Sequence, residues 1–103
     1  MTIDYGAFRR QSWEDRIATF NALSAEEKAT LVRTHMSRWL QMHREELNAE
    51  QVAVIEANIA FVTPALYVSP TSRELRTRSK ELERRAAAVL SREQMRNALT
   101  MHW

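Results

Sequence analysis

Two histidines and a tryptophan are the residues of this sequence whose types and spacing could do chemistry. His35, Trp39 and His43 recur at intervals of four, so a helix would place all three on one face. His35 and His43 would then lie about 12 Å apart along the helix axis. Zinc–nitrogen bonds of about 2.0–2.1 Å do not bridge that distance on one continuous helix. His43 and Glu46 could offer two ligands, but such a pair is common on exposed helices, so we expect neither a metal nor a cofactor.

Other signatures of catalysis and phosphate binding are missing from the sequence. Phosphate-binding loops and nucleophile elbows require several glycines, and the chain has one, Gly6. With no cysteine, the chain has no disulfide, thiol nucleophile or thiolate metal site. His35, His43 and Glu46 do not form a recognisable acid–base pair by spacing alone. We therefore expect a protein that is not an enzyme.

The helix face around Trp39 is also a candidate binding surface. Aromatic and methionine side chains are favoured at adaptable interfaces, because they offer large or flexible contact areas. The alternative is that this stripe belongs to the core, and the exposure of the Trp39 indole distinguishes the two. The predicted partner-binding residues are His35, Met36, Trp39, Met42 and His43.

The C-terminal third of the chain is basic. Residues 1–68 carry seven Lys/Arg and nine Asp/Glu, whereas residues 69–103 carry eight and four, within a net charge of +2. Basic side chains at this density could neutralise phosphates. Interleaved glutamates, with pairs such as Glu74–Arg78 at helical spacing, favour a solvated face instead, and the lack of aromatic residues there disfavours nucleic acid. Association with a membrane surface is a further alternative. The predicted basic patch comprises Arg73, Arg76, Lys80, Arg84 and Arg85.

Capping signals divide the chain into helices. A capping box places Ser, Thr or Asn at the N-cap and a Glu, Gln or Asp three residues later, so that each side chain satisfies a free backbone N–H. Thr63 followed by Pro64 marks an additional short turn, because proline is tolerated at the first helical position. The five predicted capping pairs are Ser12–Asp15, Ser24–Glu27, Asn48–Gln51, Thr71–Glu74 and Ser91–Gln94.

Apolar residues repeat at helical spacing after each of these caps. The absence of glycine beyond Gly6 also favours helices over sheets, which need many turns. The fold class predicted is all-α, an antiparallel helical bundle of about five helices with short loops. We expect an N-terminal arm at residues 1–11, with Tyr5 and Phe8 as anchors, and a single domain at 12–103. The predicted stripes are Trp13, Ile17 and Phe20; Val32, Met36, Leu40, His43 and Leu47; Val52, Ile55, Ile59 and Val62; Leu75, Ser79, Leu82, Ala86 and Val89; and Met95 and Leu99.

The N-terminal residues show neither the basic region nor the apolar region of a signal peptide. No apolar run approaches the roughly 20 residues needed to span a bilayer. Together with the absence of cysteine, which fits a reducing compartment, this predicts a soluble cytoplasmic protein.

Four segments resemble the small helical proteins of the bacteriocin fulvocin C-related family. Residues 20–28 read FNALSAEEK, residues 47–51 read LNAEQ and residues 61–67 read FVTPALY, and residues 91–94 begin the last helix. The resemblance covers residues 20–99 and implies an association with bacterial antimicrobial peptides. It supplies no catalytic signature, so no functional residue is transferred. Lack of cysteine and of an export signal argues against a secreted, disulfide-held bacteriocin.

The sequence therefore predicts a non-catalytic protein that binds a peptide or protein partner, such as an immunity protein or a biosynthetic accessory of a bacterial antimicrobial peptide. The alternative is a nucleic-acid-associated regulator that uses the basic fourth and fifth helices. Surplus apolar surface on the second or fourth helix would permit a homodimer.

Overall fold

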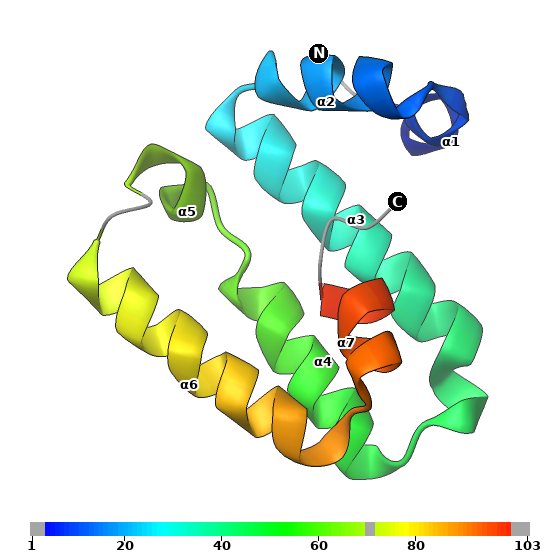
Figure 1. Cartoon of the computed structure of the whole chain (residues 1–103), viewed down its shortest axis with the longest axis vertical. Helices are drawn as coiled ribbons and strands as arrows, with labels where there is room; N and C mark the ends of the chain where they lie inside the picture. Colours follow the sequence, from blue (N-terminus) through cyan, green and yellow to red (C-terminus); the bar gives the residue numbers. More distant parts are fainter. Residues whose placement is uncertain (1–3, 70–71, 100–103) are drawn as a thin grey trace.

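The computed structural model describes residues 4–69 and 72–99, and these residues form helices and no strand (Figure 1). The predicted all-α class is confirmed. The expected count of about five helices is too low, since the described residues contain seven α-helices and one 3₁₀ turn. The elements are α1 (Tyr5–Arg10), α2 (Trp13–Asn21), α3 (Ala25–His43), η1 (Arg44–Glu46), α4 (Ala49–Phe61), α5 (Ala65–Val68), α6 (Arg73–Val89) and α7 (Arg92–Leu99).

Three long helices form the frame of the molecule. Along α3, α4 and α6 the chain alternates in direction, as short connections between sequential helices require (Figure 1). Helix α7 packs against all three of them, and α5 packs on α3. Helix α2 lies at the N-terminal end of α3 and α1 packs against the middle of α3, so the molecule is not a simple antiparallel bundle of five helices.

The predicted caps form at four of the five helix starts. Ser24 with Glu27, Asn48 with Gln51, and Ser91 with Gln94 each make both reciprocal hydrogen bonds. In the first of these, the hydrogen bonds from the Ser24 backbone and side chain lower the pKa of Glu27. The Ser12 hydroxyl accepts from the backbone N–H of Asp15. These local contacts explain why the boundaries were readable from sequence.

The start of α6 differs from the prediction. Thr71, the expected N-cap, lies outside the described residues. Ser72 caps the helix instead, and its hydroxyl accepts from the backbone N–H of Leu75. Within α6, Leu82 and Ala86 are buried as expected, but Ser79 is exposed and does not belong to the apolar stripe.

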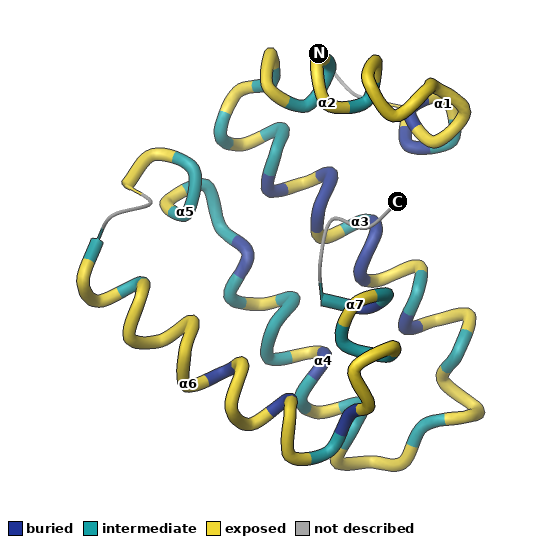
Figure 2. The backbone as a smooth tube through the Cα atoms, in the orientation of Figure 1, coloured by how far each residue is buried: buried dark blue, intermediate teal, exposed yellow. Residues whose placement is uncertain are grey.

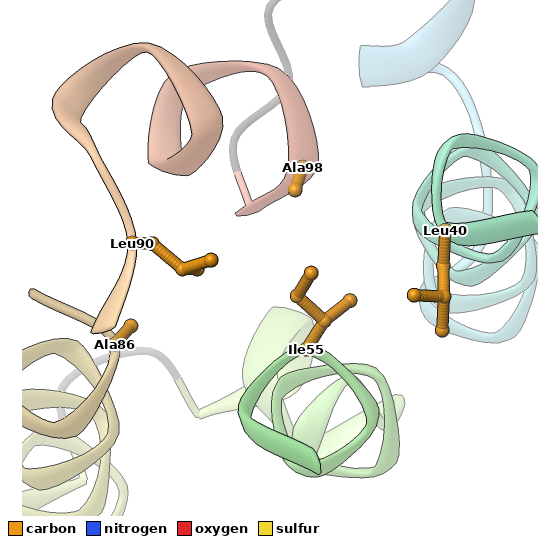
Figure 3. Close-up of a cluster of buried hydrophobic side chains, with 5 residues drawn as sticks. All are labelled: Leu40, Ile55, Ala86, Leu90 and Ala98. Carbon is orange, nitrogen blue, oxygen red and sulfur yellow. The ribbon is translucent and has the colours of Figure 1, made fainter. Parts of the chain in front are cut away.

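The main core lies where α3, α4, α6 and α7 meet. Ile55 is 0% exposed, and the side chains of Leu40, Leu90 and Ala98 surround the same interior (Figure 3). A second cluster joins Val32 and other residues of α3 to Val62 at the end of α4. Burying such apolar surface is the main favourable contribution to folding.

The two N-terminal helices differ in how they attach. In α1, Tyr5 and Phe8 are buried against Leu31, so the anchors expected within the arm are confirmed and part of that arm is helical. In α2, the expected core face is wrong: Trp13 is 53% exposed, Ile17 is 43% exposed, and no residue of that helix is fully buried (Figure 2). Helix α2 lies at the edge of the fold, and Phe20 near its C-terminal end packs against the clusters that contain Leu31 and Val32.

Candidate partner-binding cleft

A surface cleft of about 220 Å³ lies between α1 and the second half of α3. Its accessible surface is largely apolar. Four of the five predicted partner-binding residues line it, and the other four lining residues were not predicted as site residues. The cleft is lined by Tyr5, Gly6, Arg9, His35, Arg38, Trp39, Met42 and His43.

His35 forms part of the cleft and is almost fully buried, with 6% of its surface exposed. The Tyr5 hydroxyl lies 2.7 Å from its Nδ1, and the Asn97 carbonyl oxygen lies 3.3 Å from its Nε2. A single neutral tautomer satisfies both contacts, with Nε2–H donating to Asn97 and Nδ1 accepting from Tyr5. His35 therefore connects α3 to both α1 and α7.

Burial lowers the pKa of His35 below its ordinary value of 6.5, because desolvation penalises the charged ring. The hydrogen bond to the Asn97 carbonyl opposes this shift, and the positive charge of Arg9 adds to it. The imidazole is therefore held neutral near pH 7.

Trp39 is partly buried, so neither alternative proposed for it from the sequence holds in its simple form. Part of the side chain packs against the main core, beside Leu40 and Leu47. The side chain also lines the cleft, where its ring stacks on that of His43 with centroids 4.4 Å apart. Nδ1 of His43 lies 3.0 Å from a carboxylate oxygen of Glu46, which fixes the outer ring of the stack. Trp39 thus presents a supported aromatic wall.

The two methionines of the predicted surface differ in burial. Met42 is 77% exposed and lies at the cleft. Met36 is 2% exposed and packs in the second core cluster with Val32 and Val62, so it is not available to a partner. On one helix, residues six positions apart point in different directions, and the periodic stripe was too wide to separate them.

Two arginines give the cleft its charge. The Arg38 guanidinium lies 4.7 Å from the centre of the Tyr5 ring, and Arg9 follows Tyr5 by one turn on α1. Among residues 4–69 and 72–99, no carboxylate forms an ion pair with either arginine. Tyr5, Gly6 and Arg9 come from α1, a segment in which the sequence indicated only the anchors Tyr5 and Phe8. Arg38 lies on α3, but its spacing gave no sign that a ring from another helix lies beneath it.

The predicted basic patch is exposed on α6 but does not form one surface. At about 100° per residue, Arg73, Arg76, Lys80 and Arg84 lie on the side of the helix opposite the buried Leu82. By the same geometry, Arg85 lies on the flank, about 60° from Leu82. These four residues, Arg73, Arg76, Lys80 and Arg84, form a basic stripe along α6.

The expected ion pairs of α6 do not form. Within the described part of the chain, Glu74 does not pair with Arg78, and no ion pair of Glu81 is formed either. Exposed pairs of this kind contribute little to stability, so their absence costs the fold little.

The described residues contain no group of three or more His, Asp or Glu side chains placed to hold a metal ion. None of the described helices is both long and apolar enough to cross a bilayer. No known protein family, curated protein or solved structure shows significant similarity to this chain. The resemblance to the bacteriocin fulvocin C-related family therefore stays a prediction from the sequence.

Proposed function

We propose that this protein is a non-catalytic interaction protein that binds a peptide, or a segment of a protein partner, in the cleft between α1 and α3. The supporting observation is that His35, Trp39, Met42 and His43, singled out by their types and spacing, line one hollow. The partly exposed, core-supported Trp39 is the kind of side chain that contributes strongly to binding energy at interfaces.

The size of the cleft favours a peptide over a small-molecule cofactor. Sites that enclose a drug-sized molecule usually have volumes of about 300–1,000 Å³, whereas this cleft measures about 220 Å³. A hollow of that volume accommodates one or two side chains of a longer ligand whose backbone remains outside. The exposed Met42 at the cleft supplies a flexible contact that adapts to such side chains.

The biological setting follows from the sequence resemblance alone. We propose an immunity or biosynthetic accessory role in a bacterial antimicrobial peptide system, in the cytoplasm, without catalytic activity. The products of genes adjacent to this one are the first partners to test by calorimetry.

A random peptide library tests the proposal even while the natural partner is unidentified. We expect selection on the wild-type protein to return peptides whose binding weakens several-fold on Met42→Ala, because that side chain is exposed at the cleft. Val68→Ala is the matched control, since Val68 is also exposed but lies on α5, away from the cleft. Trp39→Ala should weaken binding further, and circular dichroism will establish that this variant remains folded. Peptides that bind all four proteins equally would exclude the cleft as the site.

Nucleic acid is the second candidate partner, and the basic stripe of α6 favours it. Its four cations lie on one side of the helix, and consecutive members are three or four residues apart. Such binding must weaken steeply as salt increases. Charge reversal of Lys80 and Arg84 should abolish it, whereas Arg85→Glu, on the flank, should have a smaller effect. Binding that ignores salt, or no binding of DNA or RNA, removes this candidate.

A further inference from the structure

We infer that the cleft selects an acidic peptide segment, in which a carboxylate side chain lies close to a large apolar side chain. This inference rests on the proposed function, because it specifies the chemistry of the ligand for the same cleft. The juxtaposition that supports it is a pair of arginines that form no ion pair within the described part of the chain, beside an aromatic and methionine wall.

The charge of the cleft lining favours an anionic ligand. The eight lining residues that the structure describes include two permanently charged guanidinium groups and no carboxylate. Glu46, the nearest acid to the aromatic wall in the structure's contacts, is bonded to His43 and is not among the lining residues. The charge of Arg9 is also felt within the cleft, since it helps to lower the pKa of His35. The Asp4 carboxylate lies beside Gly6 at one end of the cleft, but it accepts hydrogen bonds from the backbone N–H groups of Gly6 and Ala7. An anionic group entering the cleft would therefore meet a lining whose charge, among the described residues, is net positive.

The orientation of Arg38 is the second argument. Its guanidinium lies over the face of the Tyr5 ring, 4.7 Å from the centroid, an arrangement that restricts the side chain by a cation–π contact. Tyr5 is itself held by its hydrogen bond to His35. A guanidinium that stacks on a ring keeps N–H groups at its edge, and these fit the two oxygens of a carboxylate. Arg38 is thus partly ordered before the ligand arrives, which reduces the entropy lost on binding.

The spacing of the two regions is the third argument. Arg38 and Met42 are four residues apart on α3, which corresponds to about 6 Å along the helix. In an extended peptide, side chains two positions apart point to the same side and are separated by about 6.6 Å. An Asp or Glu two residues from a Leu, Met or aromatic residue would therefore reach both regions at once. The preferred ligand is therefore a peptide with this spacing.

The experiment uses peptides selected from the random library on the wild-type protein. We expect them to be enriched in Asp or Glu two positions from a large apolar residue. In isothermal titration calorimetry, the change of that acid to Asn or Gln should weaken binding to wild type about threefold to tenfold, as expected for a partly exposed ion pair. The same change should have a smaller effect on binding to Arg38→Gln, because Arg9 is then the only guanidinium left among the described lining residues.

Controls separate failure of this inference from failure of the proposed function. Arg33→Gln removes an exposed arginine of α3 that does not line the cleft, and it should retain the preference for acid. Cleft-dependent peptides that are neutral or basic would overturn the acidic ligand and leave the proposed function standing. A phosphoserine peptide that binds more tightly than the Asp peptide would also overturn it, since phosphate would then be the preferred anion. If no peptide depends on Met42 or Trp39, both proposals fail.

Discussion

The hydroxyl of Tyr5 and Nδ1 of His35 lie 2.7 Å apart, although 30 positions separate the two residues in the chain. This hydrogen bond is buried, and it fixes α1 against the middle of α3. One wall of the cleft is therefore positioned by a contact between a short N-terminal helix and a histidine that the sequence assigned to a stripe of either core or partner-binding residues.

Removal of the Tyr5 hydroxyl should weaken this attachment. Tyr5→Phe keeps the buried ring but removes the donor to Nδ1, and the loss of one buried hydrogen bond typically costs about 1–2 kcal/mol. We expect a corresponding fall in the free energy of unfolding measured in urea. Tyr67→Phe is the control, because the half-buried Tyr67 hydroxyl makes no hydrogen bond within the described residues. Equal effects of the two changes would contradict this account.

The stability of the protein should depend on pH through His35. Burial lowers the pKa of the folded state below 6.5, whereas in the unfolded chain the pKa is close to 6.5. Above pH 6.5 the ring is neutral in both states, so the stability is fully present. As the pH falls below 6.5, the unfolded chain takes up a proton that the folded protein does not, and the free energy of unfolding decreases towards the folded pKa.

Urea unfolding between pH 8 and pH 5 measures this dependence. His35→Gln should flatten the slope between about pH 6.5 and pH 5, while His43→Gln, at the outer ring of the cleft, should retain it. An unchanged slope in the His35 variant would show that another group is responsible.

Gly6→Ala should stabilise the protein modestly. Gly6 lies in the first turn of α1 with ordinary helical geometry, and no described residue has a positive φ. A methyl group there would meet the Asp4 carboxylate and the Arg10 side chain at 3.4 and 3.5 Å, which are ordinary contacts. Alanine has the better helix propensity, so we expect a gain of about 0.5 kcal/mol in the free energy of unfolding. A clear loss would indicate that this position tolerates no side chain.

Ile55 and Ile17 should respond very differently to the same substitution. Ile55→Ala opens a cavity at the centre of the main core and should cost about 3 kcal/mol. Ile17→Ala, on exposed α2, should change the free energy of unfolding by less than about 1 kcal/mol. Thermal or urea unfolding of the two variants provides the comparison. Similar losses would show that α2 packs more tightly than its exposure implies.

Local signals made most of the helices predictable from sequence. Capping pairs such as Ser24–Glu27 and Asn48–Gln51 join residues three positions apart, so their hydrogen bonds do not depend on the rest of the fold. Helix α1 lacks such a pair: Asp4 caps it by accepting from the N–H groups of Gly6 and Ala7, and the helix has only six residues. A short helix that contains glycine gives little periodic signal.

Only the cleft residues on α3 could be grouped from the sequence. Trp39, Met42 and His43 share α3, so their spacing placed them together. Tyr5 comes from another element, and only tertiary packing brings its ring beneath the guanidinium of Arg38. Helical spacing also does not reveal whether another helix packs on the apolar face. Trp13 and Ile17 have the spacing of core residues, yet both side chains are exposed.

The short length of α1 has a consequence for recognition. Six residues do not form a stable helix in water without tertiary support. A ligand that contacts both α1 and α3 therefore acts as part of that support, and by mass action it favours the docked arrangement. Occupancy of the cleft should slow hydrogen–deuterium exchange of the α1 amides more than that of the α6 amides, so the N-terminal helix reports directly on whether a partner is present.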